Sequence, residues 1–305
     1  MKYVIKRIVT TEPSSTELVA YLDGLRRLVG VSDKCSFPPE VIRLRKVVKT
    51  RLETDNLSSK EIDEKVREFI KSNKAIFEVD WNAIEELNPD LIIGQGLCEV
   101  CALPIKSFLN SKIKLKIPKK FRVYKVFEYS PKGFLEIAEY AYKLSKLLDV
   151  EEKGKELLNR FISEYNSLTG IGHGKRILVI EWLDPIYVAG LWISDLITAT
   201  GSQTLIRPKE FGKRVSLEEI KKFSPSLLII SPCGFDIRRT LKEIDLIHKI
   251  INDVKSIREA YVVDSAYTAN PAPRILKFVE FLRGVLTNIY DNNEKNLDKI
   301  GVKLL

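Results

Sequence analysis

The sequence predicts an α/β fold with two lobes joined by a long helical segment. In residues 5–95, and again in residues 176–286, short apolar runs typical of strands alternate with segments whose apolar residues recur every three or four positions. Between these two series, residues 131–168 keep the helical period almost throughout. The expected boundaries are a first lobe at residues 1–129, a helical linker at residues 130–170 and a second lobe at residues 171–305.

The composition is that of a globular protein and excludes several other classes. Of the 305 residues, 45% are hydrophobic and 30% are charged, and no apolar run approaches the roughly 20 residues that a membrane-spanning helix needs. Fifty Lys and Arg against 41 Asp and Glu give a net charge of +9, but the basic residues are interleaved with Glu along the whole chain. We therefore expect no nucleic-acid partner. The scarcity of Gln and Met beside abundant Lys, Glu and Ile is typical of a thermophile.

The first lobe begins with an alternating strand at residues 5–11. Ser14 and Ser15 are natural N-caps for the apolar-periodic helix that follows this strand. A second strand at residues 28–32 leads into a loop that contains two adjacent prolines, which exclude regular structure. The lobe therefore starts with the alternation of strand and helix that an α/β fold requires.

The rest of the first lobe continues this alternation. Ser58 and Glu61 fit a capping box at the start of a second helix. Residues 81–87 form a third helix, which an Asn-Pro pair ends. The run at residues 90–95 is apolar throughout its centre, as is typical of a parallel strand that is buried on both faces.

The linker is predicted as one long helical stretch with a break near Asp149 and Val150, and a Gly-rich junction ends it at residues 170–174. The second lobe then repeats the pattern of the first. Its strands are expected at residues 176–181, 227–231 and 260–264, and a closing helix carries apolar residues from 278 to 286.

Several short motifs lie at the predicted strand ends and turns. They are TEPSSTE at residues 11–17, LVGVS at 28–32, NPDLII at 88–93, EWLDP at 181–185, SPCGF at 231–235 and PAPR at 271–274. In these motifs the chain resembles the class III substrate-binding proteins of ABC importers, and among them the vitamin B12 (cobalamin) binding branch. LSSKEID at residues 57–63 and CEVCA at residues 98–102 resemble a leaderless sub-branch that is usually described as cobalamin-binding. The resemblance implies two Rossmann-like lobes with parallel sheets flanked by helices, a rigid helical linker and a ligand cleft between the lobes.

The candidate ligand-binding residues follow predicted strands, because ligands of open α/β sheets bind beyond the carboxyl ends of the strands. They are Ser14, Ser15, Phe37, Gln95, Trp182, Asp184, Tyr187, Trp192, Phe235 and Tyr267, with Arg274 as a partner for a ligand carboxylate or phosphate. The aromatic members suit a large flat ligand such as a corrin. The alternative interpretation is that Trp182 and Trp192 belong to the core of the second lobe, and that Arg274 forms a surface ion pair.

All four cysteines also follow predicted strands. They are Cys35, Cys98, Cys101 and Cys233. Four thiolates can hold zinc or a [4Fe-4S] cluster, so a metal or cluster site is one hypothesis. The alternative is that these residues are structural or redox thiols, including a Cys98–Cys101 disulfide.

The resemblance also implies one carboxylate on each lobe for docking to a permease. Glu218 matches the position on the second lobe, whereas Asn82 stands at the position on the first lobe, with Asp80 close by. Leu191 stands where the sub-branch commonly has His in a Gly-x-Trp triplet, which removes a candidate cobalt or metal ligand.

We expect a protein that binds cobalamin or another corrinoid and has no catalytic residues, since His173 and His248 lie away from the predicted strand ends. The expected partners are this small molecule and an ABC permease, and the chain itself is expected to be a monomer. No signal peptide precedes the first strand, so we expect a cytoplasmic protein, or an extracytoplasmic one if a leader has been removed. The two alternatives are a cytoplasmic zinc or iron–sulfur protein that uses the four cysteines, and a haem or iron-siderophore binding protein.

Overall fold

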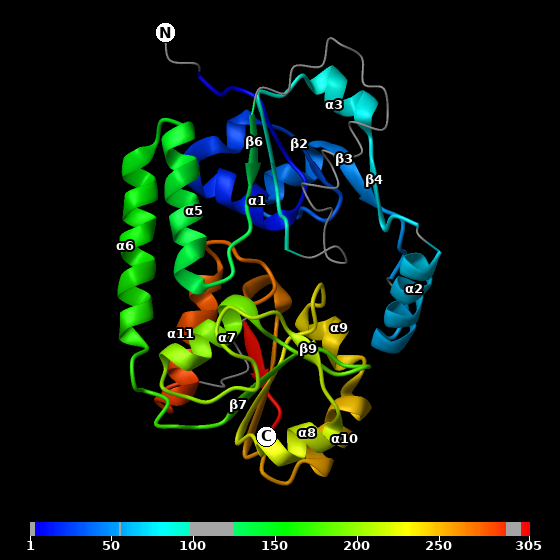
Figure 1. Ribbon diagram of the computed structural model, residues 1–305, viewed down its shortest axis with the longest axis vertical. Coiled ribbons are helices and arrows are strands. Elements are labelled where there is room, and N and C mark those ends of the chain that lie inside the picture. The colour runs from blue at the N-terminus through cyan, green and yellow to red at the C-terminus, as the bar shows by residue number, and fades with distance from the viewer. Residues whose placement is uncertain (1–3, 55, 73, 98–124, 291–299) are drawn as a thin grey trace. The chain divides into compact units, whose positions relative to one another are not determined.

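The computed structural model describes residues 4–54, 56–72, 74–97, 125–290 and 300–305 (Figure 1). The chain divides into two compact units. The first unit comprises Met1–Asn56, Glu64–Ser130 and Ala138–Leu158, and the second unit comprises Leu57–Asp63, Pro131–Ile137 and Asn159–Leu305. Each unit has a sheet of its own.

The sheet of the first unit has the strand order β4-β3-β2-β1-β5-β6 among the described residues. Its strands are β1 (Ile8–Thr10), β2 (Leu28–Ser32), β3 (Arg45–Thr50), β4 (Phe77–Val79), β5 (Leu91–Gly94) and β6 (Lys125–Glu128). Neighbouring strands are parallel, except that β4 is antiparallel to β3. Every residue of β1 and β5 is buried, as expected of central strands that are covered on both faces.

Helices of the first unit pack closely on its sheet. They are α1 (Pro13–Val19) and α3 (Trp81–Leu87), with short helical turns at Ala20–Gly24, Leu25–Arg27 and Pro39–Arg43. At Gly30 of β2, an added Cβ would lie 2.8 Å from Cδ1 of Leu87 and 2.9 Å from Cγ1 of Val47. Because the end of α3 approaches β2 so closely, this position has no room for a side chain.

The sheet of the second unit has the order β12-β11-β10-β7-β8-β9 among the described residues. Its strands are β7 (Ile177–Trp182), β8 (Tyr187–Val188), β9 (Lys213–Arg214), β10 (Leu227–Ile230), β11 (Glu259–Val263) and β12 (Gly301–Lys303). The central strands β7, β10 and β11 are parallel, whereas β8, β9 and β12 extend the sheet with antiparallel pairing. The carboxyl ends of the three central strands therefore lie at one edge of the sheet.

Helices cover both faces of this second sheet (Figure 1). They are α7 (Leu191–Ala199), α8 (Leu217–Phe223), α9 (Ile237–Leu241), α10 (Ile244–Asp253) and α11 (Ile275–Leu286), with a 3-10 turn at Ser265–Tyr267. Ile230 of β10 packs in one core with Ile220 of α8 and Ile247 of α10. Val262 of β11 belongs to the same core. Successive side chains of a strand point to opposite faces, so the adjacent Tyr261 points to the other face, where it contacts Phe281 of α11 at 5.4 Å between ring centroids.

Three helices belong partly to each unit, namely α2 (Ser59–Lys71), α5 (Phe134–Leu147) and α6 (Glu151–Ser167). The interruption between α5 and α6 confirms the predicted break near Asp149 and Val150. Asp149 adopts a left-handed backbone with φ of 58°, which ends the helical run.

The α/β fold class is confirmed, although both sheets are mixed rather than wholly parallel. The predicted strand at residues 28–32 and the predicted helix at 81–87 are reproduced with the same bounds. Six further strands, β3, β4, β6, β8, β9 and β12, were not predicted from the sequence, because β3 buries only its two central valines and the other five have four residues or fewer. No helix in the described part of the chain is both long and apolar enough to span a bilayer.

Candidate functional site

In the first unit, the loop after β1 is organised by the buried carboxylate of Glu12. This carboxylate accepts hydrogen bonds from the backbone N–H groups of Ser14 (2.5 Å) and Ser15 (2.7 Å), so Glu12 is the N-cap of α1. The prediction that Ser14 and Ser15 cap this helix is therefore wrong. Pro13 at the first helical position has no N–H to satisfy, and the two carboxylate oxygens serve the next two donors.

Burial dominates the electrostatics of this loop. It raises the pKa of Glu12, and the hydrogen bonds from Ser15 and Ser14 oppose that shift. Burial also raises the pKa of Tyr129, with the nearby Glu12 and Glu17 adding to the effect. Ser14 and Ser15 are themselves buried, so little of either predicted ligand-binding side chain lies on the surface of the unit.

Cys35 is buried against the helix that follows this loop. Its Sγ is 3.1 Å from Oγ1 of Thr16, and this hydroxyl also hydrogen-bonds with Thr10. Burial raises the pKa of the Cys35 thiol to about 12. The thiol is therefore protonated at neutral pH, whereas zinc and iron–sulfur clusters bind thiolates.

Phe37 and Gln95 differ in their surroundings. Phe37 lies in the loop after β2 and keeps 41% of its surface exposed, so it is available for contact. Gln95 is buried directly after β5, and its Oε1 accepts a hydrogen bond from the backbone N–H of Leu97. Of these two predicted residues, Phe37 is the one whose side chain the first unit presents to its surroundings.

In the second unit, the structure brings together Trp182 and Phe235, which lie far apart in the sequence. Trp182 ends β7, and Phe235 lies in the loop after the neighbouring strand β10. Their ring centroids are 5.3 Å apart with the planes tilted by 52°. Trp182 is half-buried and Phe235 is buried, so Phe235 supports the partly exposed indole. We call these two residues the aromatic pair.

Two charged residues that the sequence analysis missed stand beside the aromatic pair. The guanidinium of Arg239 on α9 lies 4.0 Å from the centroid of the Phe235 ring. Arg239 forms an ion pair at 3.1 Å with Glu243, which precedes α10. A sequence signal for this pair existed, because Arg239 and Glu243 are four residues apart, but such spacing is common on surface helices.

The remaining predicted residues of the second unit fall into two groups. Tyr187 on β8 pairs in register with Trp182, and Asp184 lies half-buried in the turn between them. Trp192 is buried, and its indole N–H donates to the backbone oxygen of Thr268 (2.7 Å), which fits the alternative interpretation of Trp192 as a core residue.

Tyr267 and Arg274 form a second contact at the carboxyl end of β11. The Arg274 guanidinium is 5.7 Å from the centroid of the Tyr267 ring. Burial raises the pKa of Asp264, which directly follows β11, and Arg274 opposes this shift. The charge of Arg274 is thus partly balanced by a nearby carboxyl group.

The four-cysteine hypothesis receives no support from the described residues. Cys98 and Cys101 lie outside them, and Cys233 is half-buried in the loop after β10. In the described part of the chain, no group of three or more His, Cys, Asp and Glu side chains is arranged to hold a metal ion. Among the described cysteines, Cys35 is buried and its thiol pKa is raised, which does not favour a metal ligand at this position.

The sequence matches the model of one protein family, that of the periplasmic binding proteins, over residues 8–253. The chain belongs to this family. As a periplasmic binding protein, it is the ligand-binding component of an ABC importer and not an enzyme. No curated protein sequence shows significant similarity to it.

Solved structures show the same fold for this binding protein. The periplasmic vitamin B12 binding protein BtuF of Vibrio cholerae is 18% identical, with 96% of this chain and 99% of that chain covered and a TM-score of 0.62. A periplasmic heme binding protein from Pseudomonas aeruginosa is 15% identical, with 98% of both chains covered and a TM-score of 0.66. A possible iron-binding protein from Staphylococcus epidermidis is 23% identical, with 95% and 100% covered and a TM-score of 0.60. At these identities the similarity establishes the fold of the binding protein and leaves its ligand open.

The predicted docking residues of this binding protein differ in availability. Glu218, in the first turn of α8, keeps 80% of its side chain exposed and pairs with Lys221 at 2.9 Å. In the first unit, Asn82 is exposed, whereas Asp80 caps α3 by accepting from the backbone N–H of Ala83 and pairs with Arg45 at 3.4 Å. Leu191 begins α7 with φ of 51°.

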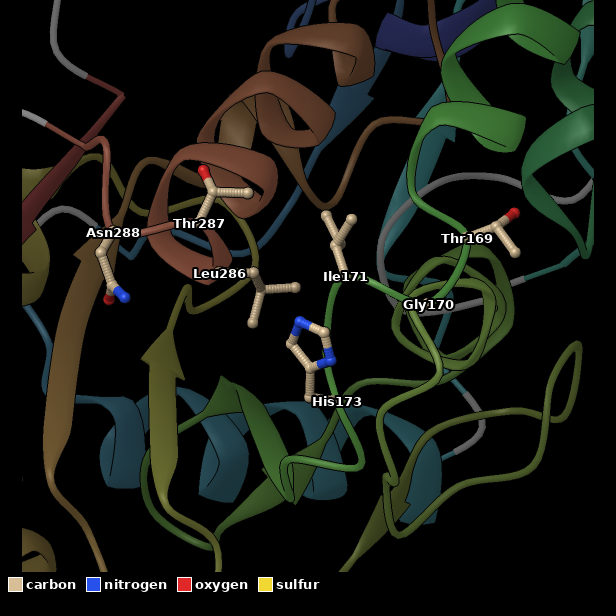
Figure 2. A pocket seen from close by; sticks show the side chains of 7 residues that line it. All are labelled: Thr169, Gly170, Ile171, His173, Leu286, Thr287 and Asn288. Atoms are coloured by element: carbon tan, nitrogen blue, oxygen red, sulfur yellow. The ribbon is translucent and has the colours of Figure 1, made fainter.

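One surface depression of about 530 Å³ lies elsewhere on the binding protein (Figure 2). Figure 2 shows its lining residues from two chain segments: Thr169, Gly170, Ile171, His173, Leu286, Thr287 and Asn288. The first segment precedes β7, so the depression lies away from the carboxyl ends of the strands. None of the predicted ligand-binding residues lines it. We assign no ligand to it.

Proposed function

We propose that this periplasmic binding protein binds a corrinoid, and that the aromatic pair of the second unit provides the main stacking surface for it. The observation that carries the proposal is the position of Trp182, which is half-buried at the carboxyl end of β7 and backed by Phe235. Ligands of open α/β sheets bind at such strand ends, and large flat ligands gain most of their affinity from aromatic contact. Phe37, exposed on the first unit, is the further aromatic candidate.

The charge around the aromatic pair favours a corrinoid over haem. Arg239 is neutralised by Glu243, and Arg274 lies near Asp264, so both arginines at these strand ends have a carboxyl group close by. Haem carries two carboxylates, for which unpaired cationic side chains would be favourable partners, whereas the rim of a corrin consists largely of neutral amides. The two histidines of the chain, His173 and His248, lie before β7 and on α10, so neither is placed to ligate a haem iron at these strand ends.

Two short sequence motifs also support a corrinoid as the ligand. The segments at residues 57–63 and 98–102 resemble a cobalamin-binding sub-branch, and the vitamin B12 binding protein of Vibrio cholerae shares the fold. The heme binding protein of Pseudomonas aeruginosa shares it as well, so haem is the alternative against which a test must discriminate.

Titration of the purified protein with cyanocobalamin, dicyanocobinamide and haemin tests the proposal. We expect both corrinoids to bind and to quench tryptophan fluorescence, and haemin to bind much more weakly. Trp182→Ala should weaken corrinoid binding by about 2 kcal/mol, roughly thirtyfold, because it removes the stacking surface. Isothermal titration calorimetry provides the dissociation constants.

The matched control is Trp81→Ala, which removes the tryptophan of the first unit at the start of α3. Its corrinoid affinity should equal that of the wild type. Tight haemin binding without corrinoid binding would assign the protein to haem, and equal losses in the two tryptophan variants would show that Trp182 has no special role.

A further inference from the structure

Seven residues, Leu57–Asp63, pack with the second unit although the chain on both sides of them belongs to the first unit. We call this segment the strap. It is one of the motifs found in the sequence, and ligand binding by the aromatic pair gives it no role. Ser58 and Glu61 form the predicted capping box at the start of α2, since the N–H of Ser58 donates to the Glu61 carboxylate (2.7 Å) and the N–H of Glu61 donates to Oγ of Ser58 (3.3 Å). The hydrogen bonds of this box lie within the strap, so other residues must hold the strap against the rest of the second unit.

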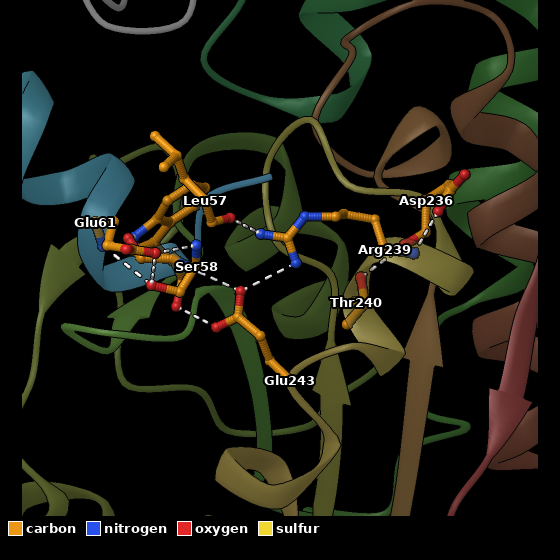
Figure 3. A network of polar contacts seen from close by, with 9 residues as sticks. Leu57, Ser58, Glu61, Asp236, Arg239, Thr240 and Glu243 are labelled. Atoms are coloured by element: carbon orange, nitrogen blue, oxygen red, sulfur yellow. Dashed lines mark hydrogen bonds and ion pairs between the residues drawn. The ribbon is translucent and has the colours of Figure 1, made fainter. Parts of the chain in front are cut away.

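A largely buried ion pair of the second unit holds the strap (Figure 3). Only 17% of the Arg239 side chain and 10% of the Glu243 side chain are exposed to solvent. Glu243 accepts hydrogen bonds from the N–H (2.8 Å) and the hydroxyl of Ser59, and Arg239 donates to the backbone oxygen of Leu57. Ser59 is fully buried, so both of its donors need acceptors within the protein, and Glu243 provides them.

The same ion pair is connected to the aromatic pair. Arg239 lies over the ring of Phe235, Phe235 contacts Trp182, and the indole N–H of Trp182 donates to the backbone oxygen of Ser59 (3.2 Å). The contacts therefore close a ring that runs from Ser59 through Glu243, Arg239, Phe235 and Trp182 back to Ser59. In such a ring each member has contacts on two sides, and the indole of Trp182 contacts both the strap and Phe235.

We propose that Arg239 and Glu243 are positioning residues that hold the strap against Trp182, and that the strap thereby sets the orientation of the indole face offered to the ligand. The consequence for affinity rests on the proposed function, whereas the positioning of Trp182 is a property of the protein without ligand. An ion pair that served stability alone would change the unfolding transition when broken and would leave the indole where it is. The test therefore measures the environment of the Trp182 indole directly.

Protein labelled with 5-fluorotryptophan gives a fluorine resonance for each of Trp81, Trp182 and Trp192, and Trp182→Phe assigns one of them. In Glu243→Gln we expect the Trp182 resonance to shift or broaden while the Trp81 resonance is unchanged. Ser59→Ala removes one hydroxyl donor and keeps the ion pair, so it should shift the Trp182 resonance less and in the same direction. If Glu243→Gln does not fold, Ser59→Ala decides.

The matched control is Glu280→Gln, which breaks the exposed pair between Lys277 and Glu280 on α11 and should leave all three resonances in place. Titration with cyanocobalamin should then give a dissociation constant roughly tenfold higher for Glu243→Gln and unchanged for Glu280→Gln. A Trp182 resonance that does not move in Glu243→Gln and Ser59→Ala overturns the proposal, and so does a shifted resonance with unchanged affinity. A wild type that binds no corrinoid refutes the proposed function, and the fluorine resonances still decide the positioning of Trp182.

Discussion

At the scale of single residues, burial determines which titratable groups are available for chemistry. Glu12 sits at the end of β1 as a helix cap, and its raised pKa reflects the cost of a buried charge that two backbone N–H groups only partly offset. Cys35 is a neutral thiol that hydrogen-bonds with Thr16. Both residues follow strands, as the candidate ligand-binding residues do, yet both are buried and form hydrogen bonds inside the first unit.

Cys35 should therefore be inert in the folded protein. We expect iodoacetamide at about pH 8 to leave Cys35 unmodified in the native state, because its thiol is buried and its pKa of about 12 keeps it protonated. Alkylation followed by mass spectrometry measures this, and the same reaction in urea is the control in which Cys35 must react. Cys35→Ser should also leave zinc and iron content unchanged, so a loss of metal in this variant would revive the four-cysteine hypothesis.

At the scale of elements, a carboxylate on another helix fixes the start of α5. Oδ2 of Asp195, on α7, accepts a hydrogen bond from the backbone N–H of Phe134 (2.8 Å), and Tyr165 on α6 donates to its Oδ1 (3.4 Å). An added Cβ at Gly133 would lie 2.7 Å from Cε of Lys209 and 3.0 Å from this carboxylate, so a side chain at this position would push against both groups. Asp195 thus caps α5 from a distance of 61 residues.

Removing this cap should destabilise the protein. We expect Asp195→Ala to lower the free energy of unfolding by about 2 kcal/mol, since it leaves a buried N–H without its acceptor, and Asp195→Asn to cost about 1 kcal/mol. Urea unfolding followed by circular dichroism provides the values. Glu156→Gln, an exposed change on α6, should stay within about 0.5 kcal/mol of the wild type. If Asp195→Ala matched this control, the cap would have no energetic role.

At the scale of the whole molecule, the two units share helices. The boundaries at 63/64, 137/138 and 158/159 fall inside α2, α5 and α6, so each of these helices has residues in both units. Helix formation is cooperative, and a helix that loses its packing at one end frays toward the other. The stability of one unit is therefore linked to that of the other through continuous backbone.

The two units should accordingly unfold together. We expect hydrogen exchange measured by mass spectrometry in increasing urea to give one midpoint for peptides covering β2 and β3 and for peptides covering β10 and β11. Asp195→Ala, a change in the second unit, should lower both midpoints by the same amount. Separate midpoints, or a shift confined to the second unit, would show that the shared helices do not couple them.

The sequence alone predicted the features that local chemistry decides. The bounds of β2 and α3, the break between α5 and α6, and the capping box of Ser58 and Glu61 depend on caps, turn residues and periodicity within a few positions. Short motifs also indicated the family, and apolar runs placed Trp182 and Phe235 at strand ends. These signals suffice because each acts along the chain over a few residues.

Only the tertiary structure decided how distant residues combine. The N-cap of α1 is Glu12 because the loop after β1 is buried, which the sequence does not show. The hydrogen bonds from Ser59 to Glu243 join residues 184 positions apart, and no local pattern marks such a pair. The sequence therefore determined the fold class and the strand-end positions of the aromatic residues, whereas packing between distant segments determined which side chains are buried, which are exposed and what holds Trp182 in place.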